Sequence, residues 1–180
     1  MPRQMNPDDI ELIEPREGMG SALAEYIEEF RDAGEPFWQD LRRAVREDYD
    51  GYLRRLRDNA AGRNLPAGRV SDSHFWLVRG QRILGTVRIR HELTPELSVV
   101  GGHIGYDVRP SERGKGYACR MLGLALDEAR RLGLRRVLLT CGKANAASAA
   151  VIRRNGGRLE NEVSSPDNTG ELMQRYWIEL

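Results

Sequence analysis

The chain has 180 residues, and its 28 basic and 27 acidic side chains nearly cancel, giving a formal net charge of +1. This length fits one domain with its own hydrophobic core, and we expect residues 1–180 to form it. Such a balance gives no overall field toward nucleic acid or a membrane surface, so neither is expected as a partner.

The cysteines and histidines indicate which classes of protein can be excluded. Cys119 and Cys141 are too few for a disulfide framework, and no apolar run resembles a secretory leader or a membrane span. We therefore expect a cytoplasmic protein with reduced thiols. His74, His91 and His103 stand apart from close Cys or carboxylate partners, so no metal site is expected.

The N-terminal third is predicted to contain one strand and several helices. Residues 10–13 form the strand. Apolar residues at helical spacing begin after Ser21, taken as the N-cap, and Gly34 and Pro36 end that helix. Helical patterns follow over residues 37–46 and 49–59, and residues 64–68 then form a loop.

The middle of the chain reads as β-structure. Residues 74–78 and 83–90 predict an antiparallel hairpin with its turn at 79–81. Residues 91–97 are expected to form a loop and 98–108 the next strand. The glycines within that strand mark a bulge or the close approach of a ligand; they are Gly101, Gly102 and Gly105.

The last third alternates between helices and strands. An apolar stripe over residues 118–132 predicts a helix that ends at Gly133. Residues 137–139 predict a buried strand that runs parallel to the preceding one. A helix over 145–155 follows. Two strands, over 158–163 and 172–179, are joined by a turn at Pro166-Asp167-Asn168. This order predicts a mixed α/β fold.

A glycine-rich stretch between the predicted strand and helix predicts a phosphate site. In Arg113-Gly114-Lys115-Gly116-Tyr117-Ala118, glycines at a helix start leave backbone N–H groups unpaired and accessible. The positive end of the helix dipole adds to them. The spacing lacks the Gly-Lys-Ser/Thr triplet of a P-loop. It also lacks the third glycine of a dinucleotide fingerprint, where Cys119 stands instead.

This stretch resembles the pyrophosphate loop of the GNAT superfamily of acyl-CoA N-acyltransferases. The family signature, Gln/Arg-x-x-Gly-x-Gly/Ala, is matched by Arg113, Gly116 and Ala118, and Val108 and Pro110 resemble the strand exit before it. The resemblance covers residues 70–160 well, and it is to a bacterial subgroup of predicted acetyltransferases. It implies a single α/β domain. Its mostly antiparallel, twisted sheet of six to seven strands has a central parallel pair that splays apart, flanked by helices.

The resemblance also implies acetyl-CoA as the acyl donor, without a metal. Its pantetheine arm would lie between the splayed strands and pair with the backbone of Tyr106 and Val108. The pyrophosphate would be held by Arg113, Gly114, Lys115, Gly116, Tyr117 and Ala118. Asn145 and Ser148 match the family's Asn-x-x-Ala/Ser helix start that faces the pantetheine arm. Both residue types also suit helix capping, and the two roles are compatible.

The catalytic groups depart from the family pattern. Direct transfer needs a base for the amine and an acid for the leaving thiolate. The family's usual tyrosine donor is replaced by Ile152, and a common base position by Gly102. We take His103 as the candidate base, because its ordinary pKa is near neutrality, and Tyr106 as the candidate acid. Strand alternation places these two on opposite faces unless a bulge intervenes.

The leading hypothesis is an N-acetyltransferase acting on the primary amine of a small molecule. The alternatives are a non-catalytic acyl-CoA-binding module, and acetylation of a protein or peptide amine. The hairpin and the N-terminal helices would line the acceptor pocket, and Arg88 or Arg90 facing it would favour a carboxylate or phosphate. By analogy with relatives that dimerise through their last strands, a homodimer is a further expectation.

Overall fold

The computed structural model describes residues 9–35, 39–166 and 170–180. The N-terminal half contains β1 (Ile10–Ile13), α1 (Gly20–Asp32), α2 (Gln39–Glu47), α3 (Tyr49–Ala60), β2 (Asp72–Arg79) and β3 (Arg82–Arg90). The C-terminal half contains α4 (Pro95–Val99), β4 (Ile104–Val108), the 3-10 turn η2 (Pro110–Glu112), α5 (Tyr117–Arg131), β5 (Arg136–Gly142), α6 (Ala146–Arg154), β6 (Arg158–Ser164) and β7 (Leu172–Glu179).

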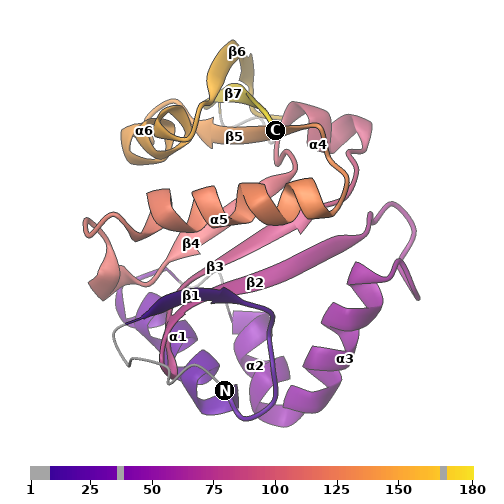
Figure 1. Ribbon diagram of the computed structural model, residues 1–180, viewed down its shortest axis with the longest axis vertical. Helices are drawn as coiled ribbons and strands as arrows, with labels where there is room; N and C mark the ends of the chain where they lie inside the picture. Colours follow the sequence, from indigo (N-terminus) through magenta and orange to yellow (C-terminus); the bar gives the residue numbers. More distant parts are fainter. Residues whose placement is uncertain (1–8, 36–38, 167–169) are drawn as a thin grey trace, which may run out of the picture.

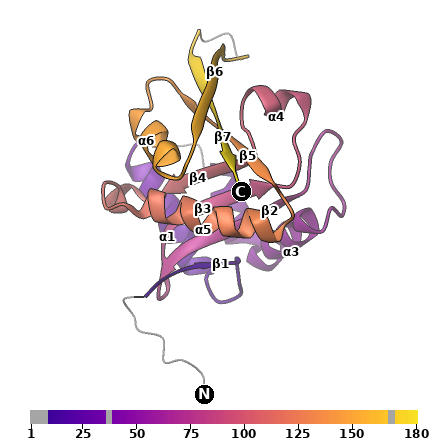
Figure 2. The same ribbon diagram turned by 45° about the horizontal axis from the view of Figure 1, so that its top comes forward.

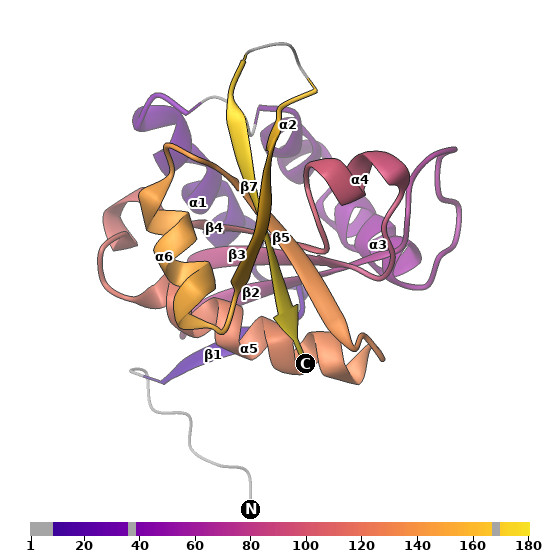
Figure 3. The ribbon, with the colours of Figure 1, turned by 90° about the horizontal axis from the view of Figure 1, so that it is seen from above.

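The strands form two antiparallel sheets. The first has the order β1-β2-β3-β4 and the second the order β5-β7-β6. Helices α1 to α3 cover one face of the first sheet, and α5 lies against its other face (Figures 1 and 2). Seen from above, the sheet of β5, β7 and β6 lies between α6 and α4 (Figure 3).

Alternation along β2 divides the core between the two faces of the first sheet. Trp76 and Val78 pack in a cluster with residues of α1, α2 and α3. Phe75 and Leu77 point the other way, into a larger cluster with α5, β5, β7 and α6. Helix α5 is therefore buried between the two sheets, and its N-terminus is held firmly relative to β4.

Most of the predicted elements are confirmed. The hairpin turns at Gly80, and Gly133 follows α5, each with positive φ. The α6 helix is capped by Asn145, and β6 and β7 are adjacent strands. The first helix begins at Gly20 with Met19 as its N-cap, so the assignment of Ser21 was wrong. Four residues of predicted helix ends and turns lie outside the described residues: Pro36, Phe37, Asp167 and Asn168.

The strand predicted over residues 98–108 is wrong in its first half. Residues Pro95–Val99 form α4 instead, because the Thr94 side chain accepts a hydrogen bond from Leu97 N at 3.2 Å and Pro95 stands at the helix start. Gly101 and Gly102 then adopt φ of 111° and 62°, so the strand begins only at Ile104.

The predicted parallel pairing of β4 with β5 is not confirmed. Across the described ranges β4 forms a ladder with β3 and β5 with β7. The two sheets are joined where β4 begins. There His103 N donates to Leu138 O at 2.7 Å, and Leu138 N donates to His103 Nδ1 at 2.9 Å. Beyond this junction β4 keeps an unpaired edge, which is the edge that a ligand can reach.

Gly102 makes this junction possible. A Cβ added there would lie 2.3 Å from the carbonyl oxygen of Leu138, and the backbone has positive φ. We expect Gly102→Ala to lower the free energy of unfolding by about 3 kcal/mol. The control Gly133→Ala has positive φ but open space at its Cβ, and should cost about 1 kcal/mol. Urea unfolding measures both, and equal losses would contradict the proposed clash.

Candidate functional site

The loop between η2 and α5 presents a row of unpaired backbone donors. Gly114 and Gly116 have φ of 76° and 81°, and a Cβ at either would meet open space. No protein acceptor within the described ranges takes a hydrogen bond from the backbone N–H groups of residues 114–119. Such donors at the positive end of α5, with no side chain covering them, suit an anionic ligand.

The two cations of this loop are already paired within the protein. The Arg113 guanidinium donates to both carboxylate oxygens of Glu35, at 2.7 and 3.0 Å, and to Val108 O at 3.1 Å. Lys115 Nζ donates to Glu112 Oε2 at 2.9 Å, and its side chain is half-exposed. The backbone N–H groups are therefore the available donors, with Lys115 at the edge of the site.

Helix α1 holds the entrance of the loop through Glu29. Its carboxylate accepts from Arg109 Nε at 2.5 Å and from Ser111 N at 2.7 Å. Burial acts to raise the pKa of Glu29, but these hydrogen bonds outweigh it and lower the pKa to about 2. The buried Arg109 also donates to Ile83 O at 3.1 Å. The Glu29 side chain of α1 and the Ile83 carbonyl of β3 thus hold the residues that lead into this loop, a contribution that the sequence did not reveal.

The backbone groups of Tyr106 and Val108 point to the unpaired edge of β4. Arg109 N donates to Leu84 O at 2.9 Å, and Arg90 N donates to His103 O at 2.7 Å. In an antiparallel ladder the alternate residues face the partner strand, so residues 104, 106 and 108 face away from β3. The Val108 carbonyl there already accepts the hydrogen bond from Arg113.

Tyr106 reaches from β4 to the first turn of α6. Its hydroxyl lies 2.8 Å from Ser148 Oγ, and Asn145 Oδ1 accepts from Ser148 N at 3.0 Å. Burial raises the pKa of Tyr106 to about 12, so the phenol keeps its proton at neutral pH. The structure therefore brings together three of the predicted site residues. The Tyr117 side chain lies apart from this group, because its hydroxyl accepts a hydrogen bond from Arg79. Only the backbone N–H of Tyr117 belongs to the glycine-rich loop.

His103 has contacts that suit a structural role. Its Nδ1 accepts the hydrogen bond from Leu138 N, and its ring packs 6.1 Å from that of Trp177. Burial, then Arg90 and Arg136, lower its pKa to about 4. The neutral ring therefore carries its proton on Nε2, and its acceptor nitrogen is already used. This geometry does not support the hypothesis that His103 is the base.

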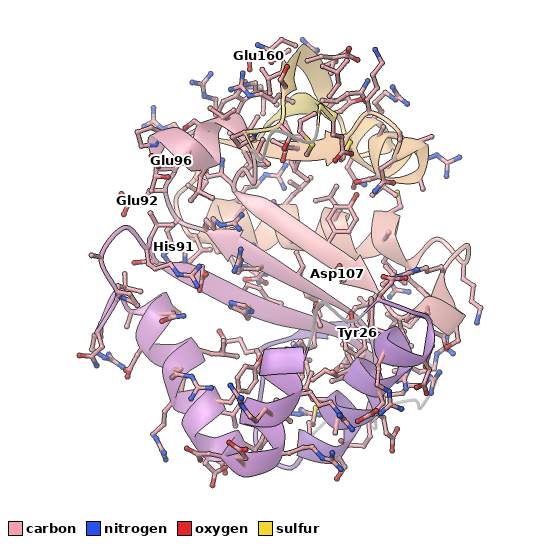
Figure 4. All side chains as sticks on the ribbon, turned by 180° about the vertical axis from the view of Figure 1, so that it is seen from behind. Tyr26, His91, Glu92, Glu96, Asp107 and Glu160 are labelled. Atoms are coloured by element: carbon pink, nitrogen blue, oxygen red, sulfur yellow. The ribbon has the colours of Figure 1, made fainter. Side chains whose placement is uncertain are left out.

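Asp107 is a candidate that the sequence analysis missed. It lies on the face of β4 opposite Tyr106, close to Tyr26 of α1 (Figure 4), whose hydroxyl donates to the Asp107 carbonyl at 3.3 Å. Burial raises the pKa of its carboxyl to about 6. On the same face Gly105 is exposed and has open space at its Cβ. The sequence signal that could have pointed to Asp107 was an acidic residue in the last strand before the glycine-rich loop.

Other sequence expectations concern cysteines, metals and membranes. Cys119 and Cys141 are free thiols, and burial raises the pKa of Cys141. Within the described ranges no three His, Cys, Asp or Glu side chains are grouped to hold a metal ion. No helix in that part of the chain has the length and apolar character needed to cross a membrane.

A family model described as an acetyltransferase (GNAT) domain matches residues 32–158. No curated protein sequence matches the chain. Among solved structures, one similar fold is the microcin C7 self-immunity acetyltransferase MccE in complex with acetyl-CoA and AMP. It has 18% identity and a TM-score of 0.70, and the match covers 96% of this chain and 93% of that one.

Two further structures share this fold. RimJ from Mycobacterium smegmatis, in complex with CoA-disulfide, has 22% identity and a TM-score of 0.72, over 96% of this chain and 83% of that one. An acetyltransferase from Salmonella typhimurium modifies the N-terminal serine of ribosomal protein L7/L12. It has 19% identity and a TM-score of 0.62, over 95% of each chain.

Proposed function

The chain belongs to the GNAT acetyltransferase family, and we propose that it transfers the acetyl group of acetyl-CoA to the primary amine of a small molecule, by direct attack of the amine on the thioester. The observation that carries this proposal is the row of unpaired backbone N–H groups at residues 114–119, beside the unpaired edge of β4. These two features match the pyrophosphate and the pantetheine arm of one extended ligand.

The loop and the strand edge have separate tasks in binding. The N–H groups of residues 114–119 hold the pyrophosphate, with Lys115 free to turn from Glu112 toward it. The outward-facing backbone of Tyr106 and Val108 pairs with the amides of the pantetheine arm. Asn145 and Ser148 border that arm from the start of α6. Together they place the thioester at the middle of β4.

Tyr106 and Ser148 supply the proton for the leaving thiolate. Their hydroxyls are joined by a hydrogen bond on the α6 side of β4, and the raised pKa of Tyr106 keeps it protonated. A hydroxyl pair in a buried gap can pass a proton to the sulfur and regain it from solvent. This replaces the tyrosine that other family members carry at the position of Ile152.

Asp107 accepts the proton of the attacking amine. It faces the opposite side of β4 from Tyr106, so base and acid lie on either side of the thioester. With a pKa of about 6 the carboxyl is ionised at neutral pH yet basic enough to take a proton, directly or through a water molecule. The open space at Gly105 lets the acceptor approach on this face.

A protein N-terminus is the second candidate acceptor. It is favoured by the Salmonella neighbour, which modifies the N-terminal serine of a ribosomal protein. Thiol release with short peptides of free and of blocked N-terminus, compared with small amines, separates the two candidates.

Gly116→Asp tests the acyl-donor site. Its carboxylate would repel the pyrophosphate from the α5 N-terminus, and we expect acetyl-CoA binding to weaken at least about tenfold by calorimetry. Gly133→Asp is the matched control, because it adds the same charge and the same backbone strain at the other end of α5. Absence of binding by folded wild type would contradict the proposed function.

Asp107→Asn tests the base. The base must be ionised, so kcat/KM of the wild type should rise with pH through about 6 and then level off. The variant should lose about 10²-fold in kcat and lose this rise. Tyr106→Phe is the comparison, since it should lower kcat while the rise through pH 6 remains. A pH profile unchanged in Asp107→Asn would rule out this role.

A further inference from the structure

A cavity of about 390 Å³ lies on the acceptor side of the first sheet. It is enclosed by α3, by residues 63–70, and by β2 and β3. Its charged lining is unbalanced, because among the described residues it contains four arginines and two aspartates: Arg55, Arg63, Arg69 and Arg88, with Asp58 and Asp72.

The two aspartates are already in contact with part of this lining. Asp58 Oδ1 accepts from Arg63 Nε at 2.9 Å and from its NH2 group at 2.7 Å. The buried Asp72 lies 3.4 Å from His74 Nε2 and 3.8 Å from Arg88 Nε.

The remaining two arginines, Arg55 and Arg69, have no ion-pair partner in the part of the chain that the structure describes. The charges of this lining also act on neighbouring Arg90. Burial and then repulsion from Arg88 lower its pKa to about 10, Asp72 opposes this effect, and Arg69 adds a smaller lowering. At neutral pH the cavity therefore carries uncompensated positive charge.

The cavity adjoins the stretch of β4 where the amine must react. Arg88 lies directly opposite Gly105 in the β3–β4 ladder, and Asp107 is two residues further along the same face. Cross-strand neighbours are about 5 Å apart and diagonal ones about 7–8 Å. An acceptor of a few bonds' length can thus reach from Arg88 to Asp107.

The cavity is separate from the donor site. The phosphate loop follows the end of β4, whereas Asp72, His74 and Arg88 pair toward the beginning of that strand. In Figure 4, His91, which directly follows β3, lies at the sheet end near α3, and Asp107 lies at the other end. The pyrophosphate of acetyl-CoA is therefore not the ligand of these arginines.

We propose that this cavity binds a carboxylate or phosphate group of the amine acceptor, so that the substrate is an anionic small molecule. The inference rests on the proposed function, because it concerns the acceptor of that reaction. Planar guanidinium groups present paired donors to both kinds of oxyanion. A polyamine would instead bring its charges against Arg55 and Arg69, and the cavity's two aspartates each already face a basic side chain of the same lining.

Binding is tested first without turnover, with inorganic phosphate as the probe. Because His74 lines the cavity, its ring resonances should shift in a saturable way when phosphate is titrated into the acetyl-CoA complex. We expect the double variant Arg55→Gln, Arg69→Gln to lose this shift. Arg57→Gln, on the same helix but outside the cavity, should keep it. A wild-type ring that does not respond would overturn the proposal.

Turnover then distinguishes carboxylate from phosphate. Acceptors are compared in pairs at saturating acetyl-CoA: β-alanine with its amide, and phosphoethanolamine with ethanolamine, with spermidine as the cationic reference. We expect kcat/KM for one anionic amine to exceed that of its neutral partner at least about tenfold. The double variant should remove this preference mainly through KM.

Preference for spermidine or for the neutral partners would overturn the inference while leaving the acetyltransferase proposal intact. If no amine in the panel is acetylated, the phosphate titration alone decides whether the cavity is an anion site. Failure to bind acetyl-CoA would refute the proposed function instead, and the phosphate titration would still report on the cavity.

Discussion

The proposed binding of acetyl-CoA depends on unpaired backbone N–H groups in the first turn of α5. Much of the surrounding structure holds this turn in place. Unpaired donors are tolerated here because solvent reaches the loop, and because Gly114 and Gly116, which adopt positive φ, have no side chain to cover them. The turn stays in place because α5 is buried between both sheets, and because Glu29 and Arg109 tie the preceding loop to α1 and β3.

Strand β4 divides the chemistry between its two faces. Its outward backbone groups lie along an edge without a partner strand in the described part of the chain, since the hydrogen bonds between the sheets there involve residues 101–103 and 138–140. Tyr106 and Ser148 lie on one side of this edge, and Asp107 and Gly105 face the other. In the proposed reaction the thiolate leaves toward the hydroxyl pair and the amine arrives from the arginine-lined side. The same alternation that builds the core thus places the proposed acid and the proposed base on opposite faces.

The sequence predicted the parts of this site that depend on local patterns. An apolar stripe and an asparagine cap predicted α5 and α6, which the structure contains, and glycines at a helix start predicted the loop that is proposed to bind phosphate. It did not predict parts that depend on contacts between distant segments. The tie from Glu29 to Arg109 spans 80 residues, and the junction at His103 depends on a strand 35 residues away. The contact of Asp107 with Tyr26 of α1 likewise joins residues 81 positions apart, and the burial that raises the pKa of its carboxyl is a property of the folded chain. A short helix capped by Thr94 replaced half of a predicted strand, because a local cap outweighed the expected extended pattern.

The central claim is that the backbone of residues 114–119 binds the pyrophosphate of acetyl-CoA. Amide hydrogen exchange, measured residue by residue with and without CoA, tests it most directly. These amides donate no hydrogen bond to any described residue, so they should exchange fast and become strongly protected when CoA is added, while those of the Gly133 turn stay unchanged. CoA binding that leaves residues 114–119 unprotected would contradict the account.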